Sequence, residues 1–120
     1  MLVNLKEILA MADQQKCAVG AFNTPNLECV NAVIAAAEKL NVPVIISHAE
    51  LHEEVSPLAK IGPVMVQAAK NAKVPVCVHL DHCETLSYIQ HRRHIRIWRY
   101  TIHWLLWSRW CTHLALNLCP

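Results

Sequence analysis

The 120-residue chain has only two glycines, Gly20 and Gly62, and neither belongs to a glycine-rich nucleotide motif. Dinucleotide-binding folds use the GxGxxG pattern and P-loops use the Walker pattern, because glycine lets backbone amides approach phosphate groups closely. Neither pattern occurs in this sequence. The scarcity of glycine therefore argues against a nucleotide-binding protein.

Paired cysteines are also missing. The chain has six cysteines, but no two of them form a CxxC pair, which argues against a zinc ribbon or a thioredoxin-type redox site. The N-terminus lacks a basic segment followed by a long apolar core, so it does not resemble a signal peptide. These features predict a cytoplasmic protein with reduced thiols.

The charged residues are divided unevenly along the chain. No arginine or tryptophan occurs before residue 91, no lysine occurs after Lys73, and no acidic residue occurs after Glu84. The net charge of +2 is too small to indicate a partner. Because one domain is not expected to exchange lysine for arginine at a single point, we divide the chain into two segments of different origin, 1–90 and 91–120.

The first segment alternates between strand-like and helix-like stretches. Asn4 and Glu7 have the spacing of a capping box, which predicts a helix that ends near Gln14. Apolar runs predict strands over 17–22, 42–47 and 74–80, and helices are expected to begin at Thr24-Pro25, at Gly62-Pro63 and at Glu84. Apolar strands that alternate with helices indicate an α/β fold with a parallel sheet covered on both faces. The pattern alone does not separate a doubly wound sheet from a barrel.

The chemistry-bearing residues follow the third predicted strand, in the run His79-Leu80-Asp81-His82. Side chains alternate along a strand, so Cys77, His79 and Asp81 are expected on one face. Sites in parallel α/β folds form outside the carboxyl ends of the strands, where a carboxylate suits proton transfer and an imidazole suits zinc. The spacing alone favours the alternative that Asp81 and His82 only cap the next helix and pair with each other, because two residues do not complete a site.

Residues 1–90 resemble the N-terminal part of class II, zinc-dependent fructose- and tagatose-bisphosphate aldolases. The matching residues are Leu2-Val3, Ala21-Phe22-Asn23, Pro43-Val44-Ile45-Ile46 and, most specifically, His79-Leu80-Asp81-His82. The resemblance implies an incomplete (β/α)8 TIM barrel that comprises the first three βα units. It also implies a lyase of glycolysis, which reversibly cleaves a ketose bisphosphate to dihydroxyacetone phosphate and glyceraldehyde 3-phosphate.

The resemblance assigns roles to two residues. Asp81 matches the residue that donates and accepts a proton at the substrate oxygen that becomes the aldehyde, and His82 matches one of three zinc-binding histidines. Substrate-binding residues are not assigned, although Asn23 and Ser47 are expected at strand ends that face the site. Ser47 either approaches a substrate phosphate or caps a loop. The sequence does not distinguish fructose bisphosphate from tagatose bisphosphate.

Much of the family's machinery lies outside the matched residues. Later barrel strands carry the other two zinc histidines of the family, its second acidic residue and its phosphate-binding loops. His48 and His52 do not replace these ligands, because we assign both to an exposed loop. We therefore predict a truncated and inactive copy. Three βα units also leave strand edges unpaired, including that of the third strand, which predicts a poorly soluble or oligomeric product. Family members oligomerise.

The tail, residues 91–120, does not continue the family pattern, and we interpret it as the out-of-frame product of a reading-frame shift near codon 90. The alternative is a non-catalytic module whose basic and aromatic cluster, 92–100, binds a membrane surface or nucleic acid. The apolar run 100–118 contains His103, Arg109 and His113, which argue against a membrane span. Under the aldolase hypothesis we expect a phosphorylated ketose as partner, and neither nucleic acid nor membrane.

Overall fold

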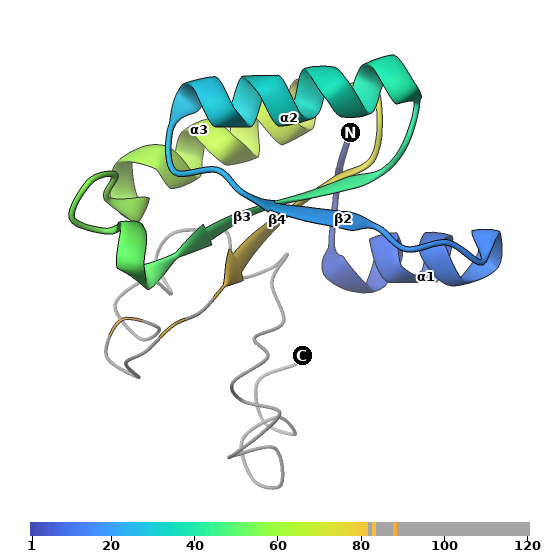
Figure 1. Ribbon diagram of the computed structural model, residues 1–120, viewed down its shortest axis with the longest axis horizontal. Coiled ribbons are helices and arrows are strands. Elements are labelled where there is room, and N and C mark those ends of the chain that lie inside the picture. Colours follow the sequence, from blue (N-terminus) through green and yellow to red (C-terminus); the bar gives the residue numbers. More distant parts are fainter. Residues whose placement is uncertain (82, 84–87, 89–120) are drawn as a thin grey trace, which may run out of the picture.

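The structure is a computed structural model that describes residues 1–81, 83 and 88. The described residues form a parallel sheet that is flanked by helices (Figure 1). The strands are β1 Leu2–Val3, β2 Gly20–Asn23, β3 Val44–Ala49 and β4 Val76–Asp81. The helices are α1 Leu5–Gln15, α2 Leu27–Leu40 and α3 Leu58–Asn71, with a short 3-10 helix, η1, over Glu50–His52.

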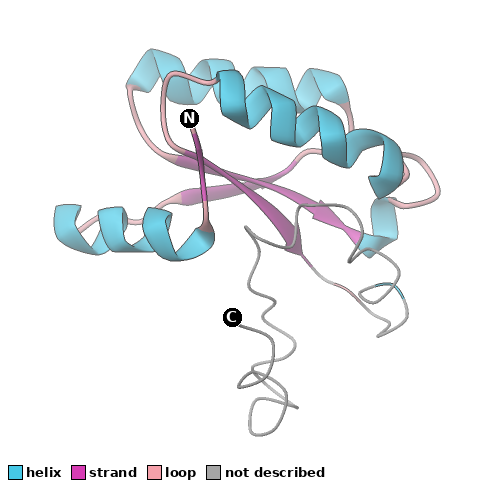
Figure 2. Cartoon of the chain, turned by 180° about the vertical axis from the view of Figure 1, so that it is seen from behind, coloured by secondary structure: helices cyan, strands magenta, loops and turns pink. Residues whose placement is uncertain are grey.

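The sheet has the strand order β1-β4-β3-β2, and all its neighbours run parallel. Helices α2 and α3 cover one face of the sheet, whereas α1 lies on the other side (Figure 2). The predicted α/β class and parallel sheet are therefore confirmed. The helix predicted to begin at Glu84 and the tail lie outside the described residues, apart from Tyr88, which is helical.

Two apolar clusters hold the layers together. The larger one lies between the sheet and helices α2 and α3, and it includes Ile46, Val76 and Val78 from the strands. The smaller one joins Ile45 and Cys77 of the opposite face to α1 and β1. Alternate strand residues thus enter different clusters, as the period of two predicts.

The start of α1 agrees with the sequence. The Glu7 backbone N–H donates to Asn4 Oδ1 at 2.8 Å, and the Asn4 backbone N–H donates to Glu7 Oε2 at 2.7 Å. These two bonds satisfy backbone donors that a helix start leaves without an intrahelical partner. The helix runs to Gln15, one residue beyond the predicted end.

The start of α2 differs from the prediction. Thr24 is not the cap, because its backbone N–H and its hydroxyl both donate to the Ser47 carbonyl oxygen, at 2.8 Å and 3.2 Å. Asn26 caps the helix instead, and its Oδ1 accepts from the Cys29 backbone N–H at 2.8 Å. Thr24 therefore links the end of β2 to β3 and leaves the cap to the next polar residue.

The predicted start of α3 at Gly62-Pro63 is wrong as well. The helix begins at Leu58, and Pro63 lies inside it. Proline in a helix interior removes one backbone hydrogen bond. The buried residues Leu58, Ile61 and Met65 pack against the sheet from both sides of Pro63, so burial of this face accounts for the longer helix.

Strand β1 was not predicted. It pairs with the start of β4, with Leu2 opposite Val76 and Val3 opposite Cys77. The edge of the third predicted strand, expected to be unpaired, is therefore covered over these two residues. The Met1 ammonium extends this attachment, since it donates to the carbonyl oxygens of three residues around the end of α3 and the start of β4, Ala69, Ala72 and Val74.

Candidate functional site

Three strands bring the predicted site residues together at their carboxyl ends. Asn23 of β2 lies opposite Ser47 of β3, which in turn lies opposite His79 of β4. Two residues further along, Asp81 lies opposite Ala49 and ends β4. The expected placement of Asp81 at the carboxyl end of a parallel strand is confirmed, and this is the edge where α/β folds form their sites.

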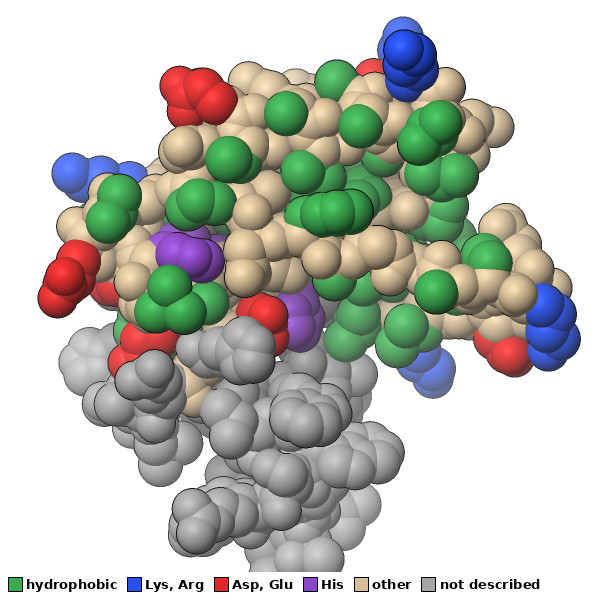
Figure 3. Space-filling model, viewed as in Figure 1, with side chains coloured by type: hydrophobic (Ala, Val, Ile, Leu, Met, Phe, Trp, Pro, Cys, Tyr) green, Lys and Arg blue, Asp and Glu red, His purple; other side chains and the backbone are tan. Residues whose placement is uncertain are grey.

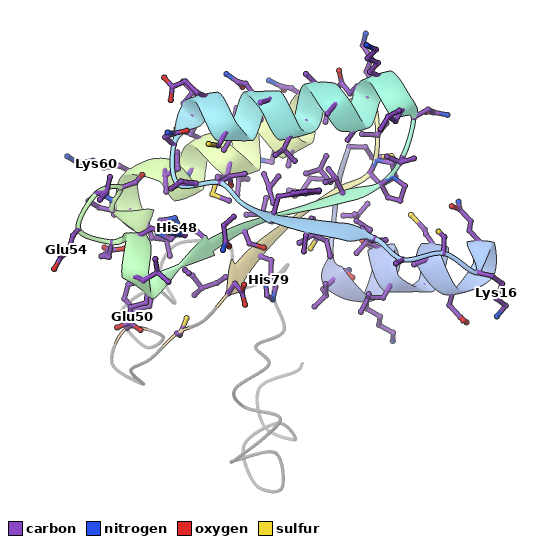
Figure 4. All side chains as sticks on the ribbon, in the orientation of Figure 1. Lys16, His48, Glu50, Glu54, Lys60 and His79 are labelled. Atoms are coloured by element: carbon purple, nitrogen blue, oxygen red, sulfur yellow. The ribbon has the colours of Figure 1, made fainter. Side chains whose placement is uncertain are left out.

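The face of the sheet that carries these residues follows from the packing. Ile45 and Cys77 lie two residues before Ser47 and His79, and they pack with Ile8 of α1. The alternation of side chains therefore puts Ser47, His79 and Asp81 on the α1 side, away from α2 and α3. Figure 4 shows the His79 side chain on this side, at the end of β4.

The environment of these side chains is mixed. Asp81 and His79 are half-buried, whereas Ser47 is only 2% exposed. The Ser47 carbonyl oxygen accepts both hydrogen bonds from Thr24, so its backbone links β3 to the end of β2. Ser47 thus has a structural role at the strand end.

Cys83 lies directly beyond this edge, and its side chain enters the larger apolar cluster with 2% exposure. Burial, with further contributions from the negative charges of Glu50 and Asp81, raises the pKa of the Cys83 thiol to about 12. A thiol with this pKa stays protonated at neutral pH. Cys83 is therefore a packing residue rather than a nucleophile.

His48 corrects one prediction from the sequence. It belongs to β3 and is fully buried, not part of an exposed loop, because β3 continues to Ala49. It lies opposite Leu80, on the face of the sheet that α2 and α3 cover. Figure 4 draws it near the start of α3. Its Nε2 atom is 3.9 Å from Glu53 Oε2, and its ring centroid is 5.5 Å from that of His52.

His52 is half-buried at the end of η1, and its Nδ1 atom accepts a hydrogen bond from the Ala49 backbone N–H at 3.3 Å. The two histidines therefore lie on the face opposite Asp81. Their arrangement supports the turn between β3 and α3. It could not be predicted from the sequence, because the burial of His48 depends on the packing of α3.

The described residues do not assemble a zinc site by themselves. Within 1–81, 83 and 88, no group of three or more His, Cys, Asp or Glu side chains is arranged to hold a metal ion. His82, the predicted zinc ligand, lies outside the described residues. Since a protein zinc site takes three or four side-chain ligands, the described donor set does not fit this metal.

Comparison with known sequences decides the family. The sequence model of the family described as "Fructose-bisphosphate aldolase class-II" matches residues 3–98. The chain belongs to this class II aldolase family. Among its relatives, the fructose-bisphosphate aldolase of Thermus caldophilus is 43% identical over 82 residues, and that of Geobacillus stearothermophilus is 42% identical over 84 residues.

These matches cover only part of each aldolase. They include 68% of this chain, but 27% of the Thermus caldophilus protein and 29% of the Geobacillus stearothermophilus protein. The crystal structure of the YdjI aldolase from Escherichia coli K12 superposes with a TM-score of 0.73 at 30% identity, over 79% of this chain and 37% of that chain. The chain thus spans about a third or less of these aldolases and has the fold of part of their barrel.

Among residues 1–81, 83 and 88, no helix has the length and the apolar character that a membrane crossing requires.

Proposed function

We propose that this chain provides the N-terminal part of a class II ketose-bisphosphate aldolase site. The reaction is the reversible cleavage of fructose or tagatose bisphosphate to dihydroxyacetone phosphate and glyceraldehyde 3-phosphate. The observation that supports this proposal is the position of Asp81, at the carboxyl end of β4 and on the same face as Ser47 and His79, in a chain of this aldolase family. We place the activity in the cytoplasm.

Asp81 is the proposed acid and base. In the cleavage direction, its carboxylate accepts the proton of the substrate hydroxyl whose oxygen becomes the aldehyde, as the carbon–carbon bond breaks. In the synthesis direction, the protonated Asp81 returns that proton to the same oxygen. A half-buried carboxylate at a strand end can reach both a substrate and the solvent, which such proton transfer requires.

His82 is the proposed zinc ligand of the complete site. The described residues do not form a metal site, so the proposal assigns no step to zinc within this chain. The remaining ligands and the phosphate-binding groups would come from barrel strands beyond the part that the chain shares with its relatives. The chain alone is therefore proposed to be inactive, and residues 91–120 are proposed to contribute nothing to the site.

A chimera tests the role of Asp81. Residues 1–90 of this chain replace the matching segment of the Thermus caldophilus aldolase, and retro-aldol cleavage is measured with both bisphosphates. We expect an active chimera in which Asp81→Asn lowers kcat by about 10²-fold or more, because the amide cannot accept the proton. The matched control is Asp13→Asn on α1. The Asp13 side chain is 84% exposed, so this chimera should retain full activity.

The outcomes separate the parts of the proposal. An active chimera that tolerates Asp81→Asn would remove Asp81 from the chemistry. An inactive chimera with a native circular dichroism spectrum would mean that this segment cannot serve in an aldolase site. The unmodified chain is assayed beside the chimera, and cleavage that a chelator abolishes in that sample would contradict the proposed inactivity.

A further inference from the structure

The Glu53 carboxylate connects three parts of the fold on the face of the sheet that α2 and α3 cover. Glu53 directly follows η1, and its side chain is 25% exposed. One of its oxygen atoms, Oε2, accepts the backbone N–H of Leu58 at 2.9 Å and the hydroxyl of Tyr88 at 2.8 Å. The same oxygen is 3.9 Å from Nε2 of the buried His48.

The contact with Leu58 supplies a helix cap. Leu58 is the first residue of α3, and Pro57 before it provides no side-chain cap. A helix start leaves backbone N–H groups without intrahelical acceptors and favours a negative charge. The Glu53 carboxylate meets both needs from five residues upstream, which explains how α3 begins without a capping residue at its own N-cap position.

The contact with Tyr88 joins regions that are distant in sequence. Tyr88 lies beyond β4, 35 residues from Glu53, and its ring is buried at 8% exposure in the larger apolar cluster. Cys83, between β4 and Tyr88, enters the same cluster. The end of β4 itself is held by the pairing of Asp81 with Ala49. Asp81 is thus held by the sheet, and Tyr88 is held by Glu53.

We propose that Glu53 is a positioning residue, which anchors Tyr88 to the start of α3 and thereby keeps Tyr88 and Cys83 packed in the larger apolar cluster. Any effect of Glu53 on catalysis rests on the proposed function of Asp81. The hydrogen bond between Glu53 and Tyr88 does not depend on that function. Hydrogen bonds to a charged acceptor are stronger than neutral ones, and the low exposure of Tyr88 strengthens this one further. His48 is a further titratable side chain beside this carboxylate, and its ring contacts that of His52.

The alkylation rate of Cys83 reports on the anchor. The full chain is treated with iodoacetamide, and each cysteine is followed by peptide mass spectrometry. We expect Glu53→Ala to raise the rate at Cys83 roughly tenfold, because loss of the anchor makes local opening more frequent. Cys77, fully buried in β4, should keep its rate. The matched control is Glu54→Ala, since Glu54 is exposed and points away from the sheet (Figure 4).

Two further variants distinguish positioning from general stabilisation. Glu53→Gln keeps an oxygen acceptor and should restore most of the protection of Cys83. Tyr88→Phe removes only the hydroxyl and should raise the alkylation rate of Cys83. In the double variant Glu53→Ala with Tyr88→Phe, that rate should exceed the rate in Glu53→Ala by less than twofold, because both changes break the same bond.

Each alternative result overturns the proposal. An unchanged Cys83 rate in Glu53→Ala would show that the anchor does not hold Cys83 in the apolar cluster. Equal acceleration at Cys77 and Cys83 would indicate loss of the whole fold rather than of one attachment. Fully additive effects of the two variants would show that Glu53 and Tyr88 act separately. None of these readouts uses aldolase activity, so failure of the anchor and failure of the proposed function are distinguishable.

Discussion

At the scale of single residues, the cysteines of the chain differ in their exposure to solvent. Cys77 is fully buried in β4, and burial, with a further contribution from the negative charge of Glu7, raises the pKa of its thiol to about 12. Cys17, between α1 and β2, is exposed. Thiolates, not thiols, react with alkylating reagents. The two positions therefore differ in access, and the raised pKa of Cys77 adds chemical protection to its burial.

We predict that iodoacetamide at pH 8 modifies Cys17 and leaves Cys77 unmodified in the folded chain. Raising the pH to 10 should still leave Cys77 protected, since the pH remains below its pKa. In urea the two rates should become similar. Peptide mass spectrometry over time checks all three conditions, and native-state labelling of Cys77 at the rate of Cys17 would contradict the burial of this part of β4.

Residues whose role depends on neighbours along the chain could be predicted from the sequence. The common face of Cys77, His79 and Asp81 follows from the alternation within one strand, and the structure confirms it. The bond between Tyr88 and Glu53 could not be predicted, because it spans 35 residues and depends on how α3 packs. His82 stays a prediction.

At the scale of elements, the ends of helices α1 and α2 share one backbone conformation. Lys16 and Asn41, their C-terminal caps, adopt left-handed conformations with φ of 53° and 52°. Each cap N–H donates to carbonyl groups of the preceding turn. Glycine adopts this conformation without steric cost, asparagine tolerates it, and lysine is strained in it.

We predict that Lys16→Gly raises the free energy of unfolding by up to about 1 kcal/mol, because the left-handed strain disappears. The lost ion pair between Lys16 and Asp13 is more than 80% exposed on both sides and contributes little. Asn41→Gly is the matched control, with a smaller expected gain. Urea denaturation of the parent and both variants measures the difference, and a loss of stability in Lys16→Gly would refute this account of the cap.

The elements also differ in how well the sequence predicted them. The first helix was predicted closely because its signals, the Asn4 and Glu7 pair, lie within one turn. The start of α2 was misplaced because Thr24 bonds to Ser47 of another strand and leaves the cap to Asn26. The start of α3 was misplaced because its cap is the side chain of Glu53, five residues upstream of Leu58. Strand β1 is two residues long, too short to carry a periodic signal, and its partner lies 74 residues away.

At the scale of the whole molecule, the sheet has an open side at β2. Among the described residues β2 pairs only with β3, and its residues are exposed. An apolar groove of about 390 Å³ lies between this strand and α2, and Phe22, Leu40 and Val42 on its walls are 50%, 70% and 43% exposed. Figure 3 shows hydrophobic side chains across this face. Exposed edges and apolar patches of this kind promote association.

We predict that the chain associates at micromolar concentrations, and that Leu40→Lys shifts it toward the monomer by placing a charge in the groove. Leu51→Lys is the matched control, since Leu51 is 63% exposed on η1, outside the residues that line the groove. Sedimentation velocity measures both variants against the parent. A monodisperse parent monomer would contradict the prediction, as would equal effects of the two lysines.

The architecture of the complete barrel could not be derived from this sequence by physical reasoning alone. Alternating strands and helices are common to doubly wound sheets and barrels, and three predicted strands do not close either one. The choice came from the family resemblance, and the family match over residues 3–98 and the superposition on the YdjI aldolase support it. A closed barrel needs further strands that pair with the edges of this sheet, and the matched parts of the relatives do not supply a complete set.

The attachment of Met1 has a practical consequence for making this protein. Its charged amine reaches three carbonyl oxygens between Ala69 and Val74, and its own carbonyl accepts from the Val76 backbone N–H at 2.9 Å. An affinity tag fused ahead of Met1, or an acetyl group on its nitrogen, would turn this cation into a neutral amide with fewer donors. Recombinant protein meant to keep β1 in place should therefore carry its tag at the opposite terminus.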